Sequence, residues 1–367
     1  MKFLVNKSTF SEAISKVSRA VAQKASEPAL EGILLSAEGS MLTLAAYNYD
    51  IGMKKEIEVN CTEAGDIIIG AKILLDIVRK MPGDEIEFIC DNSMVCHIIS
   101  ESSTFDIVGI DPATFPELPS AAGGKILNIP GNIIKSMVKG TIFAVEEENP
   151  MPMYTGIYFE VEKDYIQLVA LDGLRIAIRK ETAKNEDTMN FVATGKCISE
   201  MFKLIEDESE NIEIFVGDNH ISFNIGGYYL VSRLIEGTYL DYKSIIKDEE
   251  KTKITVNTNE IIGAIDRISL IISNPRNTPV RCSVKDEEMF FTCATTLGRS
   301  KDSCPIEKNG ADIEFGFNAK FLLDAMRATE TDEVIMIFNG EIAPIMIKPT
   351  AGDDFLYIVM PMRIRNG

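Results

Sequence analysis

Three copies of one unit follow one another along this chain, and no other feature limits its fold so strongly. Shifting the sequence by 124 residues places segment 28–59 over segment 152–183, and a similar shift places both over segment 277–308. Each copy reads as a strand, a tight polar turn, a second strand, a loop and a third strand. A period this long indicates a triplicated domain, because the repeats of solenoid proteins are only about 20–50 residues long.

Two other blocks repeat with the same spacing, and each contains a helix. One block opens every copy with a short strand, a capping residue and an amphipathic helix, and the other joins a second helix to strands. The predicted helices cover residues 7–24, 71–80, 130–140, 195–205, 257–272 and 318–329. The expected N-caps of the first helix in each copy are Ser8, Asn132 and Thr258 or Asn259.

These blocks predict an α+β chain of three tandem domains, each with two helices packed on antiparallel sheets. The expected domains are residues 1–124, 125–248 and 249–367, joined at AAGGK (121–125) and KDEEKTK (247–253). Small-residue and charged stretches of this kind are typical of domain boundaries. Because the copies differ in sequence, the repeat preserves shape rather than chemistry, which favours a scaffold.

Several function classes find no support in the composition. The apolar runs are too short to span a bilayer, and the N-terminus lacks a signal-peptide core, so we expect a cytoplasmic protein. The seven cysteines include no C-x-x-C pair, and only two histidines, His97 and His220, occur in the chain. These cysteines and histidines predict no disulfide framework, no metal site and no cofactor.

An enzyme with a carboxylate site is the alternative from another class, since Asp and Glu number 56. These acids are scattered at turns and strand edges, as in GDEIEF and EDESEN, which is typical of solvated faces. No phosphate-binding loop, nucleophile elbow or dinucleotide fingerprint occurs. The sequence therefore predicts a protein without a catalytic site.

Charge is distributed unevenly along the chain. The net charge is −19, which alone argues against nucleic acid, yet the six predicted helices together carry about +8. Lys and Arg also favour helices by propensity, so this bias has a simpler explanation. However, Lys16 and Arg19 share one helix face, as do Lys135 and Lys139. Such faces suit non-specific contact with a DNA backbone, and a peptide-binding scaffold that never meets DNA is the alternative.

The motifs ALDGLRIA (170–177), LIEGTYLDY (234–242), FNAKFLLDA (317–325) and VMPMRI (359–364) resemble those of the bacterial DNA polymerase III beta subunits, the sliding clamps. The resemblance covers the whole chain. It implies a head-to-tail homodimer that closes a six-domain ring around duplex DNA and confers processivity in replication. The implied partners are the replicative DNA polymerase alpha subunit, the clamp loader, and translesion polymerases, mismatch repair and ligase proteins with short linear motifs. No membrane and no cofactor are implied.

The resemblance also implies a hydrophobic peptide-binding pocket between the second and third domains, with the C-terminal tail as one wall. Arg175 and Arg363 are expected at its rim as hydrogen-bond donors. An ordinary last core strand is the alternative interpretation of VMPMRI. Carried over by position, the pocket comprises Tyr154, Leu171, Gly173, Leu174, Arg175, Ile176, Leu240, Ser244, Ile245, Asn277, Asn318, Phe321, Ile342, Pro344, Ile358, Val359, Met360, Pro361, Met362, Arg363 and Ile364.

The chain departs from the family pattern at some of these positions. Leu171, Leu174 and Leu240 stand where polar residues or proline occur in relatives, which predicts a more apolar pocket. The loop 146–154 is acidic, so we expect DNA contact through basic residues instead. The expected DNA-lining residues are Lys24, Lys72, Arg79, Lys80, Lys135, Lys139, Lys196 and Lys203.

The resemblance further implies that the edge strand of the first domain pairs with the third domain of a second copy. Phe105 and Ile107 would then meet Ile271 and Ile272. All four also read as ordinary core residues, which is the alternative interpretation. Pairing of exposed edges would remove a route to aggregation.

Overall fold

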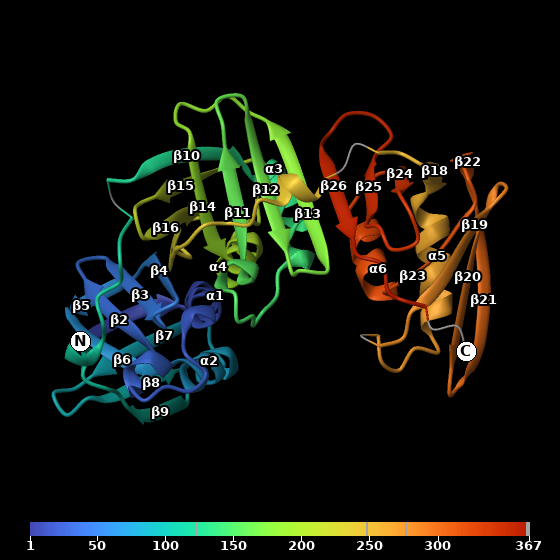
Figure 1. Cartoon of the computed structure of the whole chain (residues 1–367). Coiled ribbons are helices and arrows are strands. Elements are labelled where there is room, and N and C mark those ends of the chain that lie inside the picture. Colours follow the sequence, from blue (N-terminus) through green and yellow to red (C-terminus); the bar gives the residue numbers. More distant parts are fainter. Residues whose placement is uncertain (122, 247–248, 276, 365–367) are drawn as a thin grey trace. The chain divides into compact units, whose positions relative to one another are not determined.

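A computed structural model describes residues 1–121, 123–246, 249–275 and 277–364. Parts of both expected linkers, residue 122 and residues 247–248, lie outside the described residues. Figure 1 labels the helices and strands and colours the chain from its N-terminus in blue to its C-terminus in red. The chain divides into two compact units. The first unit comprises Met1–Asn132 and Lys196–Leu234, and the second comprises Ile133–Gly195 and Ile235–Gly367. Each unit therefore joins one outer repeat to part of the middle repeat.

The three repeats share one order, namely a strand, a helix, a run of strands, a second helix and three strands, although among the described residues the second repeat has one strand fewer between its helices. The first contains β1 (Lys2–Asn6), α1 (Lys7–Val17), η1 (Ser18–Ala20), η2 (Pro28–Glu31), β2 (Gly32–Glu38), β3 (Met41–Tyr47), β4 (Ile51–Glu58), β5 (Asn60–Glu63), β6 (Gly65–Gly70), α2 (Ala71–Lys80), β7 (Glu85–Cys90), β8 (Val95–Ser100), β9 (Ser103–Val108) and η3 (Pro112–Thr114). The second contains β10 (Lys125–Pro130), α3 (Gly131–Lys139), η4 (Ile142–Ala144), η5 (Pro152–Thr155), β11 (Gly156–Val161), β12 (Tyr165–Leu171), β13 (Arg175–Thr182), β14 (Met189–Thr194), α4 (Gly195–Leu204), β15 (Asn211–Val216), β16 (His220–Ile225), β17 (Tyr228–Arg233) and η6 (Tyr242–Ile245). The third contains β18 (Thr252–Asn257), α5 (Thr258–Ser269), β19 (Val280–Lys285), β20 (Glu288–Thr295), β21 (Gly298–Pro305), β22 (Glu307–Gly310), β23 (Ile313–Phe317), α6 (Ala319–Arg327), β24 (Glu333–Phe338), β25 (Ile345–Pro349) and β26 (Phe355–Val359).

Antiparallel sheets continue from one repeat into the next within each unit. The first unit holds an eight-stranded sheet of order β10-β15-β16-β17-β4-β3-β2-β6 and a five-stranded sheet of order β5-β1-β7-β8-β9. The second holds a nine-stranded sheet, β14-β11-β12-β13-β26-β25-β24-β18-β22, and a four-stranded sheet, β21-β20-β19-β23. The joints between repeats are the pairs β17·β4 and β13·β26. The expected α+β architecture of tandem helix-and-sheet repeats is confirmed.

Helices cover the buried faces of these sheets through apolar stripes. In the first repeat, Phe10 of α1 meets Phe3 edge-to-face, and Phe3 stacks on Phe88 with ring centroids 5.0 Å apart. In the third repeat, Phe315 packs against Phe338 at 4.9 Å. Burial of such rings is worth about 25 cal/mol for each Å² removed from water, so these layers hold the repeats together.

The predicted helices occur, but two details differ. The caps are Asn6 and Asn257 rather than Ser8 and Thr258 or Asn259, because the strands before the helices end at these asparagines. The Asn6 Oδ1 accepts from the Thr9 amide at 3.1 Å. The first helix ends at Val17 and not at 24, since the Ser18 hydroxyl donates to the Ile14 carbonyl at 2.5 Å and the chain tightens into a 3-10 turn.

Five of the cysteines are buried and two are partly exposed, and none is bonded to another. Among the described residues, no group of three or more His, Cys, Asp or Glu side chains could hold a metal ion. Within the same residues, no helix is both long and apolar enough to cross a membrane.

Candidate functional site

An apolar cluster covers one face of the β13·β26 joint in the second unit. In register, Ile176 lies opposite Ile358 and Ile178 lies opposite Leu356. We call the buried set the joint cluster; it comprises Val169, Leu171, Ile176, Ile178, Tyr242, Ile335, Ile337, Met346 and Ile358. Tyr154 and Ile245 pack against it as half-buried neighbours. The structure therefore brings together five of the predicted pocket residues, Leu171, Ile176, Ile358, Tyr154 and Ile245.

The turn before β13 places an exposed leucine beside the tail. The Asp172 Oδ1 accepts from the amides of Leu174 and Arg175, both at 2.9 Å, and this Asx turn needs a left-handed residue at Gly173 (φ 82°). The Leu174 carbonyl in turn accepts from the Met360 amide at 2.8 Å. Four predicted pocket residues have large, exposed apolar side chains: Leu174, Leu240, Ile342 and Met360. Exposed apolar side chains that border a cluster are typical of interaction sites.

Arg175 does not stand at the rim as expected. Its side chain is only 6% exposed, and it donates to Asp172 at 2.9 Å and to Asp324 at 2.7 Å. The guanidinium also lies 4.5 Å from the ring centroid of Phe321. The expectation is wrong because Arg175 pairs with Val359 on the opposite face of the strand from Ile176. Arg175 therefore fixes α6 and the turn, and Phe321 belongs to the same buried assembly.

The segment after β17 is held onto the joint cluster by aromatic and polar contacts. Tyr239 stacks on Tyr158 with centroids 4.6 Å apart, and its hydroxyl donates to the Val169 carbonyl at 3.2 Å. The Tyr242 hydroxyl donates to Glu160 at 2.7 Å, and the Lys243 ammonium donates to the same carboxylate at 2.8 Å. These contacts fix Leu240, Ser244 and Ile245 within the segment.

Glu160 is the buried acid of this network. Burial opposes its ionisation, but hydrogen bonds from Lys243, Tyr165 and Tyr242 outweigh burial and hold the pKa of the carboxyl below its usual value. Sequence analysis missed Glu160, Tyr239 and Tyr242 as parts of the site. The paired tyrosines of LIEGTYLDY were the available signal, whereas the acid lies some eighty residues earlier in the chain.

The tail divides into two parts with different roles. Ile358 and Val359 belong to β26 and are buried, so they form the end of a core strand. From Met360 the chain leaves that sheet, and the Met362 amide donates to the Gly316 carbonyl at 2.8 Å. A Cβ atom at Gly316 would lie 2.6 Å from the Met362 carbonyl oxygen, so the tail approaches this position only because the residue is glycine. The core-strand interpretation of VMPMRI therefore holds for Val359, whereas the pocket-wall interpretation of the residues from Met360 onward stays a prediction.

The remaining predicted pocket residues are not members of the joint cluster. Asn318 caps α6 and donates to the Pro275 carbonyl at 3.1 Å, and Pro344 precedes β25. Pro361 is half-buried and lies between Met360 and Met362, whose amides bond to Leu174 and Gly316. The others line a cleft of about 1210 Å³ on the third repeat, namely Asn277, Met362, Arg363 and Ile364.

Basic side chains lie on the helices of the first unit. A groove of about 610 Å³ runs beside α1 and contains the hydroxyls of Ser8, Ser11 and Ser15 together with Arg19 and Arg79. Arg79 donates to Ser15 at 3.0 Å. Four other predicted DNA-lining residues are exposed in this unit: Lys24, Lys72, Lys80 and Lys196. Lys203 is paired with Glu200 at 2.7 Å. The serines and Arg19 were missing from the predicted set.

The other two predicted DNA-lining residues, Lys135 and Lys139, belong to α3 in the second unit. Lys139 lies 2.6 Å from Glu330, and its hydrogen bond lowers the pKa of that carboxyl. The observed helices remain basic in sum, although α1 is shorter than predicted and leaves Lys24 beyond its end.

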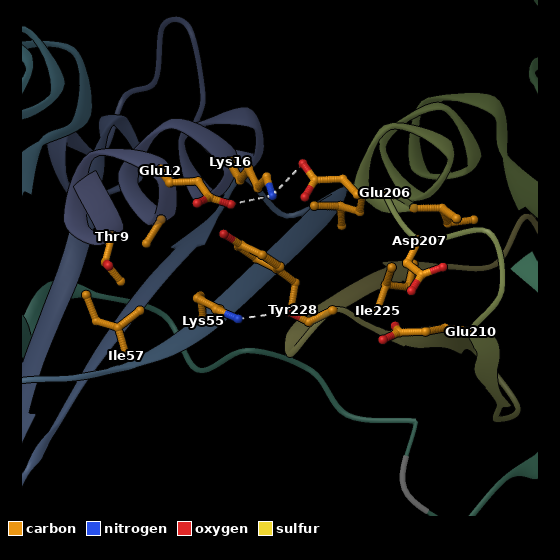
Figure 2. A pocket seen from close by; sticks show the side chains of 14 residues that line it. Thr9, Glu12, Lys16, Lys55, Ile57, Glu206, Asp207, Glu210, Ile225 and Tyr228 are labelled. Atoms are coloured by element: carbon orange, nitrogen blue, oxygen red, sulfur yellow. Dashed lines mark hydrogen bonds and ion pairs between the residues drawn. The ribbon is translucent and has the colours of Figure 1, made fainter.

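The joint of the first unit is closed by ion pairs (Figure 2). Lys16 is buried between Glu12 at 2.7 Å and Glu206 at 2.8 Å, and its ammonium lies 5.0 Å from the centroid of the Tyr228 ring. Burial alone would lower the pKa of Lys16, yet the bonds to the two glutamates leave that pKa raised. Lys55 spans the same joint by donating to the Gly226 carbonyl at 2.8 Å. Lys16 is thus a structural residue and not a free surface cation.

One of the two predicted seam regions, Phe105 and Ile107, lies on the edge strand β9, whereas Ile271 and Ile272 follow α5 and belong to no strand. Within the described residues, β9 pairs only with β8, and β21 pairs only with β20. Phe105 of β9 is 43% exposed, whereas the equivalent residues Leu230 and Tyr357 of the other repeats are fully buried by the neighbouring repeat. Ile107, Ile271 and Ile272 are each half-buried.

Comparison with known proteins places these features in a family. Models of the DNA polymerase III beta subunit match the chain in three parts: the N-terminal domain over residues 1–119, the central domain over 128–241 and the C-terminal domain over 243–363. A solved chain from Eubacterium rectale that is assigned to the same subunit is 30% identical, with a TM-score of 0.95, over 99% of this chain and 100% of that one. The chain belongs to the DNA polymerase III beta subunit family.

Two other relatives agree. The DNA polymerase sliding clamp from Bacillus subtilis is 28% identical and has a TM-score of 0.95 over the full length of both chains. The beta sliding clamp of Halalkalibacterium halodurans is 29% identical over 99% of this chain and 100% of its own length. The family is a non-catalytic one, which agrees with the sequence-based prediction that the chain is no enzyme.

Proposed function

We propose that two copies of this chain close head to tail into a ring that encircles duplex DNA without sequence preference and confers processivity on a DNA polymerase. The single observation that carries the proposal is the exposure of Phe105. Its two equivalents inside the chain are fully buried at β17·β4 and β13·β26, and among the described strands the edges β9 and β21 are the equivalents left to make a third such joint. Six equivalent joints of this kind would close a ring of six domains.

The internal joints also give the register of the proposed seam. Leu230 lies opposite Met53, and Tyr357 lies opposite Ala177. By its pairing with the preceding strand of its own repeat, Phe105 is equivalent to Leu230 and Tyr357. By the same criterion, Ser300 is equivalent to Met53 and Ala177. An antiparallel seam would then place Asp106 opposite Arg299 and Val108 opposite Leu297.

Both further pairs are chemically matched. Asp106 and Arg299 carry opposite charges, and Val108 and Leu297 are largely exposed apolar residues. On the helix side, Phe143 meets Tyr357 edge-to-face at 5.4 Å in the β13·β26 joint. Residues Ile271 and Ile272 follow α5 as Phe143 follows α3, which supports their proposed contact with Phe105.

The joint cluster and the exposed side chains of Leu174, Leu240, Ile342 and Met360 support the proposal that short apolar motifs of partner proteins bind here. We expect the replicative polymerase alpha subunit, the clamp loader and repair or translesion proteins to share this site. The groove beside α1 and the exposed lysines of the first unit are the proposed DNA-facing surface, where hydroxyls and cations would contact phosphates. The proposed domains remain residues 1–124, 125–248 and 249–367.

Retention on DNA tests the ring. The protein is loaded by a cognate clamp loader with ATP onto circular plasmid, and half of the sample is then cut once with a restriction enzyme. We expect the protein to stay on circles through gel filtration and to leave the linear form. Equal retention on both forms would overturn topological binding and leave only a peptide-binding scaffold.

A further inference from the structure

A basic cleft crosses the four-stranded sheet of the third repeat. Cross-strand partners form one row from the edge strand to the tail: Lys301 opposite Thr292, Thr292 opposite Arg281, Arg281 opposite Gly316, and Gly316 opposite Met362. Directly opposed residues point to the same face of a sheet. With strands about 4.8 Å apart, the row measures about 19 Å, the length of about six extended residues.

The charge of this cleft is of one sign. Its volume is about 1210 Å³, and four of its lining residues are cations: Arg281, Arg299, Lys301 and Arg363. None of the described residues that line the cleft is acidic, although the chain as a whole carries −19. Arg281 also contacts Glu314, which does not itself line the cleft, at 2.6 Å. A cleft of this charge would attract an anionic ligand.

Apolar atoms complete the cleft and connect it to the joint cluster. Pro279, Cys293 and Ala294 line it beside the cations, and Met362 and Ile364 supply the wall formed by the tail. The tail bonds to Leu174 through Met360 and to Gly316 through Met362, so only Pro361 separates the exposed side chain of Met360 from the cleft. A chain that leaves the apolar face along the tail would reach the row of cations directly.

We propose that the basic cleft binds an acidic segment that flanks the apolar motif of a partner protein. The inference rests on the proposed peptide-binding function and adds a second, electrostatic contact to it. A segment of about six residues matches the row, with carboxylates reaching Arg281, Lys301 and Arg363. Arg299 lies at the edge strand, where its proposed partner is Asp106 of a second copy. The mixture of cations with apolar wall atoms favours a peptide over a bare phosphate backbone.

The test uses the full chain and fluorescein-labelled peptides that share one Gln-Leu-type apolar motif. Each peptide carries a flank of six residues, placed before the motif in one pair of peptides and after it in the other. Within each pair, the flank consists of Asp and Glu in one peptide and of their amides Asn and Gln in the other. Affinity is measured by anisotropy at low and high salt. We expect one acidic-flank peptide to bind about tenfold more tightly than its amide counterpart at low salt, and we expect this advantage to shrink as salt is added.

Two variants locate the effect. Combining Arg281→Gln with Lys301→Gln should remove the advantage of the acidic flank while leaving the affinity of the amide-flank peptide unchanged. Lys285→Gln, an exposed charge on the same strand as Arg281 and outside the cleft, should preserve the advantage. Lys301→Gln alone should reduce the advantage of the acidic flank in part. This single variant serves as a control in case the substitution at Arg281 impairs folding.

Each other result has a distinct meaning. Equal binding of acidic and amide flanks, or an advantage that survives the double substitution, would overturn the acidic-segment proposal and leave the apolar pocket standing. If the amide-flank peptide itself failed to bind, this result would refute the proposed pocket and the inference that rests on it. If the double variant lost retention on DNA circles while both flanks bound alike, the cleft would serve nucleic acid instead.

Discussion

Replacing Phe105 by alanine should open the proposed ring without unfolding the chain. Phe105 is 43% exposed in the single chain. A phenylalanine side chain presents about 200 Å², so the seam would bury about 90 Å² of it, worth about 2 kcal/mol at 25 cal/mol per Å². A two-fold ring has two seams, and the loss of about 4 kcal/mol corresponds to a weakening of the dimer by about a thousandfold.

The assay is the molar mass from light scattering across a dilution series, together with a thermal melt of the same samples. Ile73→Ala is a matched control, because Ile73 on α2 is also about half exposed and lies on no sheet edge. We expect the control to dimerise as the unchanged protein does. A Phe105→Ala variant that dimerised with unchanged affinity would refute both the seam and the equivalence with Leu230 and Tyr357.

Three further predictions concern the second unit. Removing the buried guanidinium with Arg175→Ala should lower the free energy of unfolding by about 3 kcal/mol in urea titrations, because among the described residues Asp172 loses its only cation and Asp324 keeps only Lys320, at 3.0 Å. A loss below about 1 kcal/mol would contradict this. Gly316→Ala should push the tail away and weaken binding of an apolar-motif peptide, whereas Gly263→Ala, which meets only the flexible Arg267 side chain, should not. The pKa of Glu160 is lower in the folded chain than its ordinary value of 4.5, so its stabilisation exists above about pH 4.5 and is lost as pH falls further. In thermal melts, the melting temperature of the unchanged protein should therefore exceed that of Glu160→Gln near neutral pH, and this difference should shrink as pH falls below about 4.5. A difference in melting temperature that stayed constant with pH would be evidence against this role of Glu160.

The repeat predicted most of the fold because periodicity and order of elements are local properties. Six helices and the strands between them follow from apolar spacing alone. Cap positions were missed by one or two residues, since the run Asn6-Lys7-Ser8-Thr9 offers several capping side chains. The choice is made by the strand, whose last ladder pair joins Asn6 to Glu85 far along the chain. That pairing is tertiary information and cannot be read from the run itself.

The site was harder to predict because its burial depends on distant partners. Arg175 looks like an exposed loop residue in ALDGLRIA, but Asp324 lies 149 residues further along the chain and draws it inside. Glu160 is one acid among 56, and only Tyr242 and Lys243 on a later segment single it out. In contrast, resemblance already grouped several apolar residues that the structure brings together at the joint cluster, since such side chains need only a common face and not a specific partner.

Equivalent positions at the joints explain why we propose a binding site at one joint of the chain and not at the other. The pair Ile176·Ile358 of the β13·β26 joint corresponds in register to Gly52·Val231 of the β17·β4 joint. In the latter, Leu118 fills the space over Gly52, as a Cβ there would lie 3.2 Å from its methyl group.

The connecting chain thus covers the joint of the first unit, and Tyr229 holds it through the Pro119 carbonyl at 3.4 Å. Over the β13·β26 joint the corresponding segment is fixed by Tyr239 and Tyr242 but leaves Leu240 exposed. At the proposed seam the same register position would hold Asp106 and Arg299, a charged pair in place of an apolar one. The same backbone joint thus presents a different pair of side chains at each place. The chain itself covers the pair of the first unit, and we propose that a peptide covers the pair of the second unit and that an ion pair forms at the seam with a second copy.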